Sequence, residues 1–192
     1  MLEVEVKYRN ADRAAAVAML LDWGAALAQD RTDVDLYFSA PDRDLKATDE
    51  AFRLRRTGAK NCLTYKGPKR DSETKTRPEI EVALADGDET AADTERLLVA
   101  LGYKPVTTVR KKRRVYRFQR DGFDLEACFD SVDHVGEFVE LEILAEESQY
   151  EAAKATLLAA AAELGLTEQE KRSYLGMVLA AQRGEPGASA TG

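Results

Sequence analysis

The chain has 192 residues, of which 44% are hydrophobic and 33% charged, a composition typical of one soluble globular domain. The net charge of −7 argues against a general nucleic-acid-binding protein. No apolar run has the length of a membrane span or the pattern of a signal peptide, so we expect a cytoplasmic protein that does not bind membranes. Its two cysteines, Cys62 and Cys128, are too few for a disulfide framework and lack metal-ligand spacing.

The N-terminal half of the chain predicts five strands and one helix. Residues 2–9 alternate strictly between charged and apolar side chains, which is the period of a β-strand. Asn10 can cap a following helix that ends near Trp23. Period-2 patterns then predict strands over 33–39, 51–56, 62–66 and 79–84, with a hairpin turn at 57–60.

The C-terminal half predicts three more strands and three helices. A helix is expected over 88–101, followed by a long basic strand over 106–119, a tight turn at 121–122, and strands over 123–130 and 137–144. Capping-box patterns at 148–151 and 167–170 predict the starts of the last two helices. Short connections between about eight strands indicate an α+β fold with a mostly antiparallel sheet. We expect the domain to cover residues 1–183 and the Gly/Pro/Ala/Ser tail 184–192 to be disordered.

Several of the predicted strands carry charged pairs spaced two residues apart, so that both members of a pair point to one face. The opposite face of each acidic strand is apolar. The acidic pairs are Glu3 and Glu5, Glu79 and Glu81, and Glu140 and Glu142, and the basic pairs are Arg53 and Arg55, and Lys111 and Arg113.

A solvent-facing sheet surface explains any single charged pair. Such a surface usually mixes polar residues and opposite charges, however, whereas here whole pairs of one sign recur on separate strands. The set therefore predicts a closed barrel, in which the charged faces line the interior and the apolar faces pack outward against helices.

An interior with charges of both signs predicts metal-dependent phosphoryl chemistry. Hard cations such as Mg²⁺ and Mn²⁺ prefer oxygen ligands, which glutamate supplies. Arginine and lysine suit phosphate oxygens. Catalysis would then depend mainly on positioning and charge neutralisation. No P-loop motif is present in the sequence.

Motifs along residues 1–180 resemble those of the CYTH superfamily, which includes class IV adenylyl cyclases, thiamine triphosphatases and inorganic triphosphatases. The segment 63–68 (LTYKGP) and the terminal Ser173-Tyr174 favour the class IV adenylyl cyclase branch. In chain order the motifs are Glu3-Val4-Glu5-Val6-Lys7, Asp35-Leu36-Tyr37-Phe38, Phe52-Arg53-Leu54-Arg55, segment 63–68, Arg77 with Glu79 and Glu81, the basic strand 109–116, Asp130, segment 136–142 (GEFVELE), and Ser173-Tyr174.

The resemblance implies a triphosphate tunnel, that is, a closed antiparallel barrel of about eight strands with flanking helices. It assigns phosphate binding to basic residues, metal binding to acidic ones, and a catalytic role to Lys7 together with Glu3 and Glu5. The implied substrate-binding residues are Arg53, Arg55, Lys66, Lys111, Arg113, Glu79 and Glu81. The implied metal ligands are Glu3, Glu5, Asp130, Glu140 and Glu142.

The leading functional hypothesis is a class IV adenylyl cyclase-like enzyme that converts ATP to cyclic AMP and pyrophosphate with Mg²⁺ or Mn²⁺. One alternative is a triphosphatase that hydrolyses thiamine triphosphate, inorganic triphosphate or a nucleoside triphosphate. Another is a non-catalytic protein that binds polyphosphate or nucleotides. All three take a triphosphate-containing small molecule as partner, and a homodimer is suggested by analogy alone.

Overall fold

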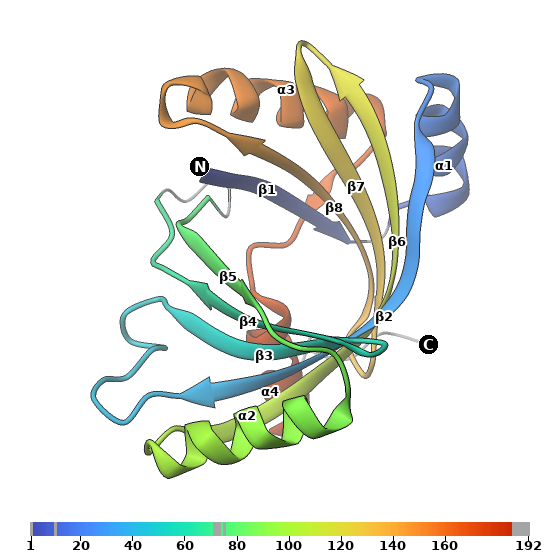
Figure 1. Cartoon of the computed structure of the whole chain (residues 1–192). Coiled ribbons are helices and arrows are strands. Elements are labelled where there is room, and N and C mark those ends of the chain that lie inside the picture. Colours follow the sequence, from blue (N-terminus) through green and yellow to red (C-terminus); the bar gives the residue numbers. More distant parts are fainter. Residues whose placement is uncertain (1, 10, 71–73, 75, 186–192) are drawn as a thin grey trace.

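The computed structural model describes residues 2–9, 11–70, 74 and 76–185. One strongly curved sheet dominates the molecule, and the helices lie outside it (Figure 1). The strands are β1 (Leu2–Arg9), β2 (Ala26–Ser39), β3 (Ala51–Thr57), β4 (Lys60–Lys66), β5 (Glu79–Ala83), β6 (Lys104–Arg120), β7 (Phe123–Val132), β8 (Gly136–Ala145) and β9 (Glu168–Gln169). The helices are α1 (Arg13–Asp22), α2 (Asp88–Ala100), the short 3₁₀ helix η1 (Glu147–Gln149), α3 (Tyr150–Glu163) and α4 (Tyr174–Gln182).

The nine strands form one antiparallel sheet in the order β5-β4-β3-β2-β6-β7-β8-β1-β9. The sheet curls into a half-barrel, which brings β5 toward β1 (Figure 1). Within the described residues, a single bridge between Glu3 and Arg77 joins these two sides in place of a continuous ladder. The predicted antiparallel α+β fold is confirmed, and the predicted barrel is a curled half-barrel whose two sides meet through the Glu3–Arg77 bridge and the Lys66–Glu3 ion pair.

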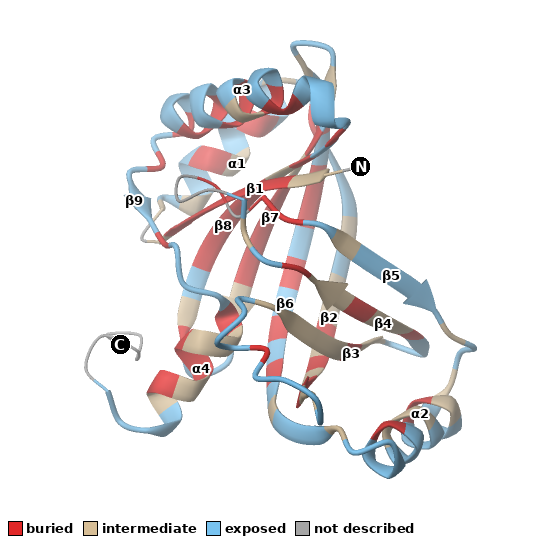
Figure 2. Ribbon diagram, turned by 90° about the vertical axis from the view of Figure 1, so that its left-hand side faces the viewer, coloured by how far each residue is buried: buried red, intermediate tan, exposed pale blue. Residues whose placement is uncertain are grey.

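The apolar faces of most strands pack outward, as the alternation predicts, whereas Ile80 and Val82 on β5 are 59% and 51% exposed. Val4 and Val6 on β1 are 0% exposed and belong to one core with Leu141 on β8 and Leu157 on α3. Figure 2 shows this buried side of α3 against the sheet. Burying each such aliphatic side chain stabilises the fold by about 1.5–3 kcal/mol, so the outward core leaves the inner face to charged residues.

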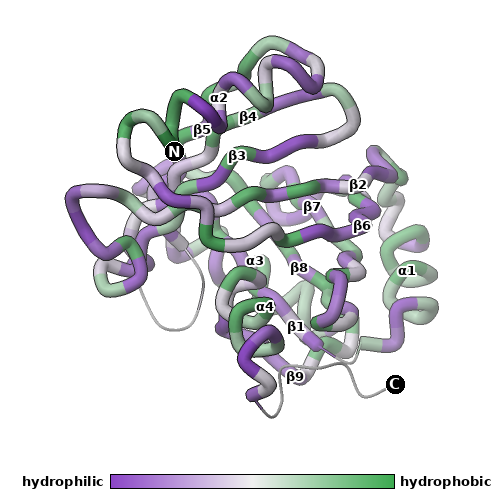
Figure 3. Tube along the Cα trace, turned by 90° about the horizontal axis from the view of Figure 1, so that it is seen from below, coloured by the Kyte–Doolittle hydropathy of each residue, from purple (hydrophilic) through white to green (hydrophobic). Residues whose placement is uncertain are grey.

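Two further helices cover other parts of the sheet. Leu98 of α2 packs over β2 and β3, and Met177 of α4 packs against residues of β6, β7 and β8. The view from below in Figure 3 places α3 and α4 near β1 and β8, with α2 beyond β3 and β4. None of the described helices is both long and apolar enough to cross a membrane.

Three of the predicted element boundaries are wrong. Helix α1 is capped by Asp12, whose side chain accepts a hydrogen bond from the Ala15 amide, while Asn10 lies outside the described residues. Strand β2 begins at Ala26 because its pairing with the long β6 continues through an irregular register near Leu27. The capping box near 148–151 lies two residues earlier, between Glu146 and Gln149, where it opens η1.

The capping-box pattern at 167–170 does not begin a helix. Glu168 and Gln169 instead form β9, which pairs with the end of β1. Glu170 cannot complete a capping box because its carboxylate accepts hydrogen bonds from Arg9 and Arg172. Helix α4 begins at Tyr174, and the Ser173 side chain caps it. The predicted tail lies outside the described residues from 186 onward.

Candidate functional site

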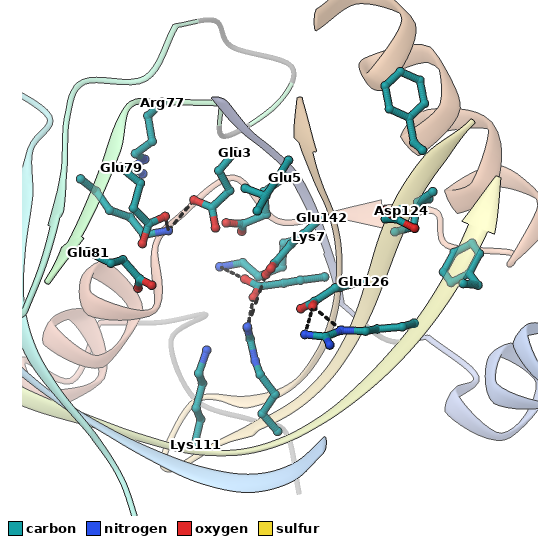
Figure 4. Close-up of a pocket in the computed structure, with 18 of the residues that line it drawn as sticks. Glu3, Glu5, Lys7, Arg77, Glu79, Glu81, Lys111, Asp124, Glu126 and Glu142 are labelled. Atoms are coloured by element: carbon teal, nitrogen blue, oxygen red, sulfur yellow. Dashed lines mark hydrogen bonds and ion pairs between the residues drawn. The ribbon is translucent and has the colours of Figure 1, made fainter. Parts of the chain in front are cut away.

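The inner face of the curved sheet lines a cavity of about 1390 Å³. Figure 4 shows acidic and basic side chains pointing into this space from opposite walls. Of the predicted site residues, only Asp130 is absent from the lining. The predicted residues that line the cavity are Glu3, Glu5, Lys7, Arg53, Arg55, Lys66, Glu79, Glu81, Lys111, Arg113, Glu140 and Glu142.

Most acidic residues of the inner face lie beside basic residues on a neighbouring strand. The sheet register places Asp35 opposite Arg55, Lys66 opposite Glu79, and Arg113 opposite Asp130. Lys7 likewise lies opposite Glu140. The rows of like charge expected from the sequence are therefore largely balanced across strands, which lowers the cost of burying them.

Glu142 departs from this pattern in the strand register, although Arg113 on β6 donates from Nη1 to its Oε1 at 3.3 Å. It lies opposite Glu5 on β1 and opposite Glu126 on β7, so carboxylates flank it on both sides. Carboxylate oxygens of Glu3, Glu5 and Glu142 all lie within 4.8 Å of one another. Figure 4 shows these three side chains converging from β1 and β8. We call Glu3, Glu5 and Glu142 the carboxylate cluster.

Two members of the carboxylate cluster, Glu3 and Glu142, have raised pKa values, mainly because they are buried. Burial is the main cause that raises the pKa of Glu142 to about 8, and the charges of Glu3, Glu140 and Glu5 add to it against the opposing Arg113. Burial also raises the pKa of Glu3, although Lys66 opposes it. An all-oxygen cluster in this state suits a hard divalent cation, because such an ion would relieve the repulsion.

Asp130 and Glu140, which were also predicted to bind metal, contact basic residues in this structure. Arg113 donates from Nε to Asp130 Oδ1 at 2.7 Å and from Nη2 to Asp130 Oδ2 at 2.6 Å. The Tyr174 hydroxyl donates to Asp130 Oδ2 at 2.8 Å. Glu140 accepts a hydrogen bond from Arg113. A metal-binding role for these two acids stays a prediction.

The basic residues of β3 are oriented by Asp35 on β2. Arg55 donates from Nε to Asp35 Oδ1 at 2.7 Å and from Nη2 to Oδ2 at 2.8 Å. Arg53 contacts Asp35 Oδ2 at 3.3 Å and the Tyr37 hydroxyl at 3.2 Å. Although burial opposes ionisation, Arg53 and Arg55 hold the pKa of Asp35 well below its usual range. Both guanidinium groups are therefore fixed before any ligand binds.

Lys66 joins the two walls of the cavity. Its Nζ donates to Glu3 Oε2 at 2.6 Å and lies 2.8 Å from Glu79 Oε2. Burial opposes the charge of Lys66, but the carboxylates of Glu3 and Glu79 raise its pKa above the usual value. On the next inner position of β5, Glu81 accepts a hydrogen bond from Thr64 at 3.2 Å. Lys66 thus contacts a member of the carboxylate cluster directly.

Sequence reasoning missed three residues of this site. Asp33 is fully buried near Lys111 and accepts a hydrogen bond from Thr57, and Arg31 lies 3.1 Å from it. Glu126 lines the cavity beside Glu142. The Asp33-x-Asp35 spacing repeats the carboxylate pairs of the other strands, so the same rule could have identified Asp33.

The family model for the CYTH domain matches residues 1–174. The chain belongs to the CYTH family. A CYTH relative from Methanocaldococcus jannaschii, named as a candidate adenylate cyclase, is 38% identical over 142 residues, which cover 74% of this chain and 77% of the relative.

Solved structures show the same CYTH fold. The PH1819 protein from Pyrococcus horikoshii is 34% identical and has a TM-score of 0.79, with 92% of this chain and 98% of that chain covered. A Hippeastrum protein has a TM-score of 0.65 at 18% identity, with 96% of both chains covered. It is described as a candidate adenylyl cyclase with a dominant triphosphatase activity.

Proposed function

We propose that this CYTH protein is a metal-dependent enzyme that acts on a triphosphate substrate, with an adenylyl cyclase-like reaction that converts ATP to cyclic AMP and pyrophosphate. The observation that carries the proposal is the position of Glu142. Two carboxylates flank it across the neighbouring strands, and Arg113 donates to it at 3.3 Å. A site that concentrates negative charge at one point, within reach of fixed arginines, suits a cation and a polyanion together.

Glu3, Glu5 and Glu142 would hold Mg²⁺ or Mn²⁺, since they offer only oxygen ligands and carry raised pKa values at Glu3 and Glu142. When bound, the ion would supply charge neutralisation of phosphate oxygens and a lowered pKa for an attacking hydroxyl group. The sheet register places Glu5 opposite Glu142, and Arg113 donates from Nη1 to Glu142 Oε1 at 3.3 Å, so the cluster adjoins one of the candidate phosphate-binding arginines.

Five basic residues would bind the triphosphate, namely Arg53, Arg55, Lys66, Lys111 and Arg113. Asp35 and Asp130 hold three of the guanidinium groups in place, so that these donors need little reorganisation on binding. Burial and the charge of Arg113 lower the pKa of Lys111, which favours contact of this ammonium group with an anion.

A triphosphatase is the second candidate function. The Hippeastrum protein of the same fold is described as having a dominant triphosphatase activity. In the triphosphatase reaction the cavity would orient a water molecule toward the terminal phosphorus atom. In the cyclase reaction it would instead orient a ribose hydroxyl group toward the first phosphorus atom. A protein that binds triphosphates without turnover is the third candidate.

A product assay separates the three candidates. The purified protein is incubated with ATP, thiamine triphosphate or inorganic triphosphate, each with Mg²⁺ or Mn²⁺, and the products are resolved by chromatography. Cyclic AMP with pyrophosphate supports the cyclase. Orthophosphate without cyclic AMP rejects the cyclase in favour of the triphosphatase, and metal-dependent binding without any product leaves only the binding protein.

Metal binding at pH 7 is expected to release about one proton, because a group with a pKa of about 8 is mostly protonated at that pH. Glu142 must lose this proton to become a ligand. As the pH increases toward 8, the apparent Mn²⁺ affinity should therefore rise about tenfold per pH unit. Calorimetric titration in buffers of different ionisation enthalpy measures the released proton. The Glu142→Gln variant should release none, and a wild-type titration without proton release would contradict the prediction.

Lys66→Met is expected to weaken binding of inorganic triphosphate by about 10- to 100-fold, because a charge-assisted contact is worth about 1.5–3 kcal/mol. The matched control is Lys69→Met, since Lys69 lies outside the cavity lining and pairs with Asp49. Calorimetry on both variants gives the two dissociation constants. Equal affinities for both variants would show that Lys66 does not contact the ligand.

A further inference from the structure

The C-terminal segment of the chain holds the side chain of Lys7. The Lys7 Nζ donates to the Arg172 main-chain oxygen at 2.7 Å and lies 3.9 Å from the centre of the Tyr174 ring. It also lies 3.9 Å from Glu140 Oε1. Lys7 is only 1% exposed although it lines the cavity, so its contacts with polar groups of the protein decide where the ammonium group lies.

One carboxylate shapes the segment that carries the Arg172 carbonyl. Glu170 Oε1 accepts from the Arg172 main-chain amide at 2.9 Å and from Arg172 Nε at 3.0 Å. Glu170 Oε2 accepts from Arg172 Nη2 at 2.7 Å and from Arg9 Nε at 2.6 Å. Because Glu170 is only 7% exposed, these charge-assisted bonds are poorly replaced by water.

The same residue is tied to β1 at two points, Lys7 and Arg9. The Glu170 amide donates to the Lys7 main-chain oxygen at 2.7 Å, and the Glu170 carboxylate holds the Arg9 side chain two residues further on. Glu170 therefore connects the backbone of Lys7 to the carbonyl group that receives the Lys7 ammonium group. It does not itself line the cavity.

We propose that Glu170 is a positioning residue that orients the Lys7 ammonium group toward a bound triphosphate through the Arg172 carbonyl. This role rests on the proposed function and on the predicted catalytic role of Lys7, which lines the same cavity. It differs from a general structural role, because loss of the Glu170 carboxylate should affect ligand binding only as long as Lys7 is present.

A double-mutant cycle tests this dependence. The affinity for inorganic triphosphate is measured by calorimetry without metal for wild type, Glu170→Gln, Lys7→Met and the double variant. Glu170→Gln is expected to weaken binding about 10-fold, since misplaced contact groups cost this much or more. In the Lys7→Met background the same change should alter the affinity less than about twofold, because the two effects share one path.

Glu50→Gln is the matched control, because Glu50 also receives a two-pronged arginine contact, from Arg43 at 2.9 and 3.0 Å, but lies outside the cavity lining. Its affinity should equal that of wild type. Glu170→Asp is the second variant in case Glu170→Gln does not fold. It keeps the charge but shortens the reach to Arg9 and Arg172, so a loss in the same direction is expected.

Three outcomes would overturn the proposal. Unchanged affinity in both Glu170 variants would show that the carboxylate does not influence the ligand. Additive losses in the double variant would assign Glu170 a structural role independent of Lys7. Wild-type protein that binds no inorganic triphosphate would instead overturn the proposed function itself, and the role of Glu170 with it.

Discussion

Glu5→Gln is expected to reduce metal-dependent turnover by about 100-fold or more, the effect of removing one preorganised charged group from an active site. Glu5 supplies one of the three carboxylates that lie within 4.8 Å of one another. Glutamine has the same shape but weaker metal affinity. The substitution also removes a negative charge that repels the Glu142 carboxylate and raises its pKa. Because this repulsion is lost, the metal-free variant should remain folded. Turnover and thermal unfolding of the variant measure the two effects separately.

The control for this prediction is Glu137→Gln. Glu137 lies on β8, the strand of Glu142, but its side chain is 62% exposed and pairs with Arg13 outside the cavity. This control variant should keep wild-type turnover. Wild-type activity in Glu5→Gln, at saturating and at limiting Mn²⁺, would exclude Glu5 as a metal ligand.

Arg113→Met is expected to lower the free energy of unfolding by about 3–5 kcal/mol, the cost of removing one partner from a buried ion pair. Asp130 is 0% exposed, and Arg113 makes two of its hydrogen bonds. Without the guanidinium group, this carboxylate and Glu140 remain buried beside an apolar side chain. Urea-induced unfolding of wild type and variant gives the difference.

Two further variants make this measurement specific. Arg114→Met alters the next residue of β6, which is exposed, and should change the free energy of unfolding by less than about 0.5 kcal/mol. Arg113→Lys keeps the charge but loses the two-pronged geometry, so an intermediate loss is expected. If Arg113→Met proves as stable as Arg114→Met, then Asp130 does not depend on Arg113 for its burial.

The inner and outer faces of the strands followed from local patterns in the sequence. In residues 2–9, in Arg53-x-Arg55 and in Glu140-x-Glu142, alternation alone separated cavity-facing from core-facing side chains. On β5 it separated the cavity-facing Glu79 and Glu81 from side chains that face solvent. This succeeded because the period of two is a property of the strand backbone and holds in any sheet. The same property explains why all but one of the predicted site residues line the cavity.

The partners of each charge, in contrast, depended on the tertiary structure. Asp130 and Glu142 were equivalent as acidic residues in the sequence, but the register of β6 with β7 places Asp130 against Arg113. The register of β8 with its neighbours places Glu142 between Glu5 and Glu126. Strand register and sheet curvature arise from contacts distant in sequence, which periodicity within one strand does not specify.

The backbone conformation of segment 167–170 also depended on tertiary contacts. Its local pattern favours a helix start, yet it forms β9, because the free edge of β1 offers backbone partners and Arg9 binds the Glu170 carboxylate. The sequence by itself thus determined which side chains face the cavity, since that follows from strand geometry. Only the tertiary structure decided which carboxylates lie together, because burial and pairing across strands set the energy of each charge.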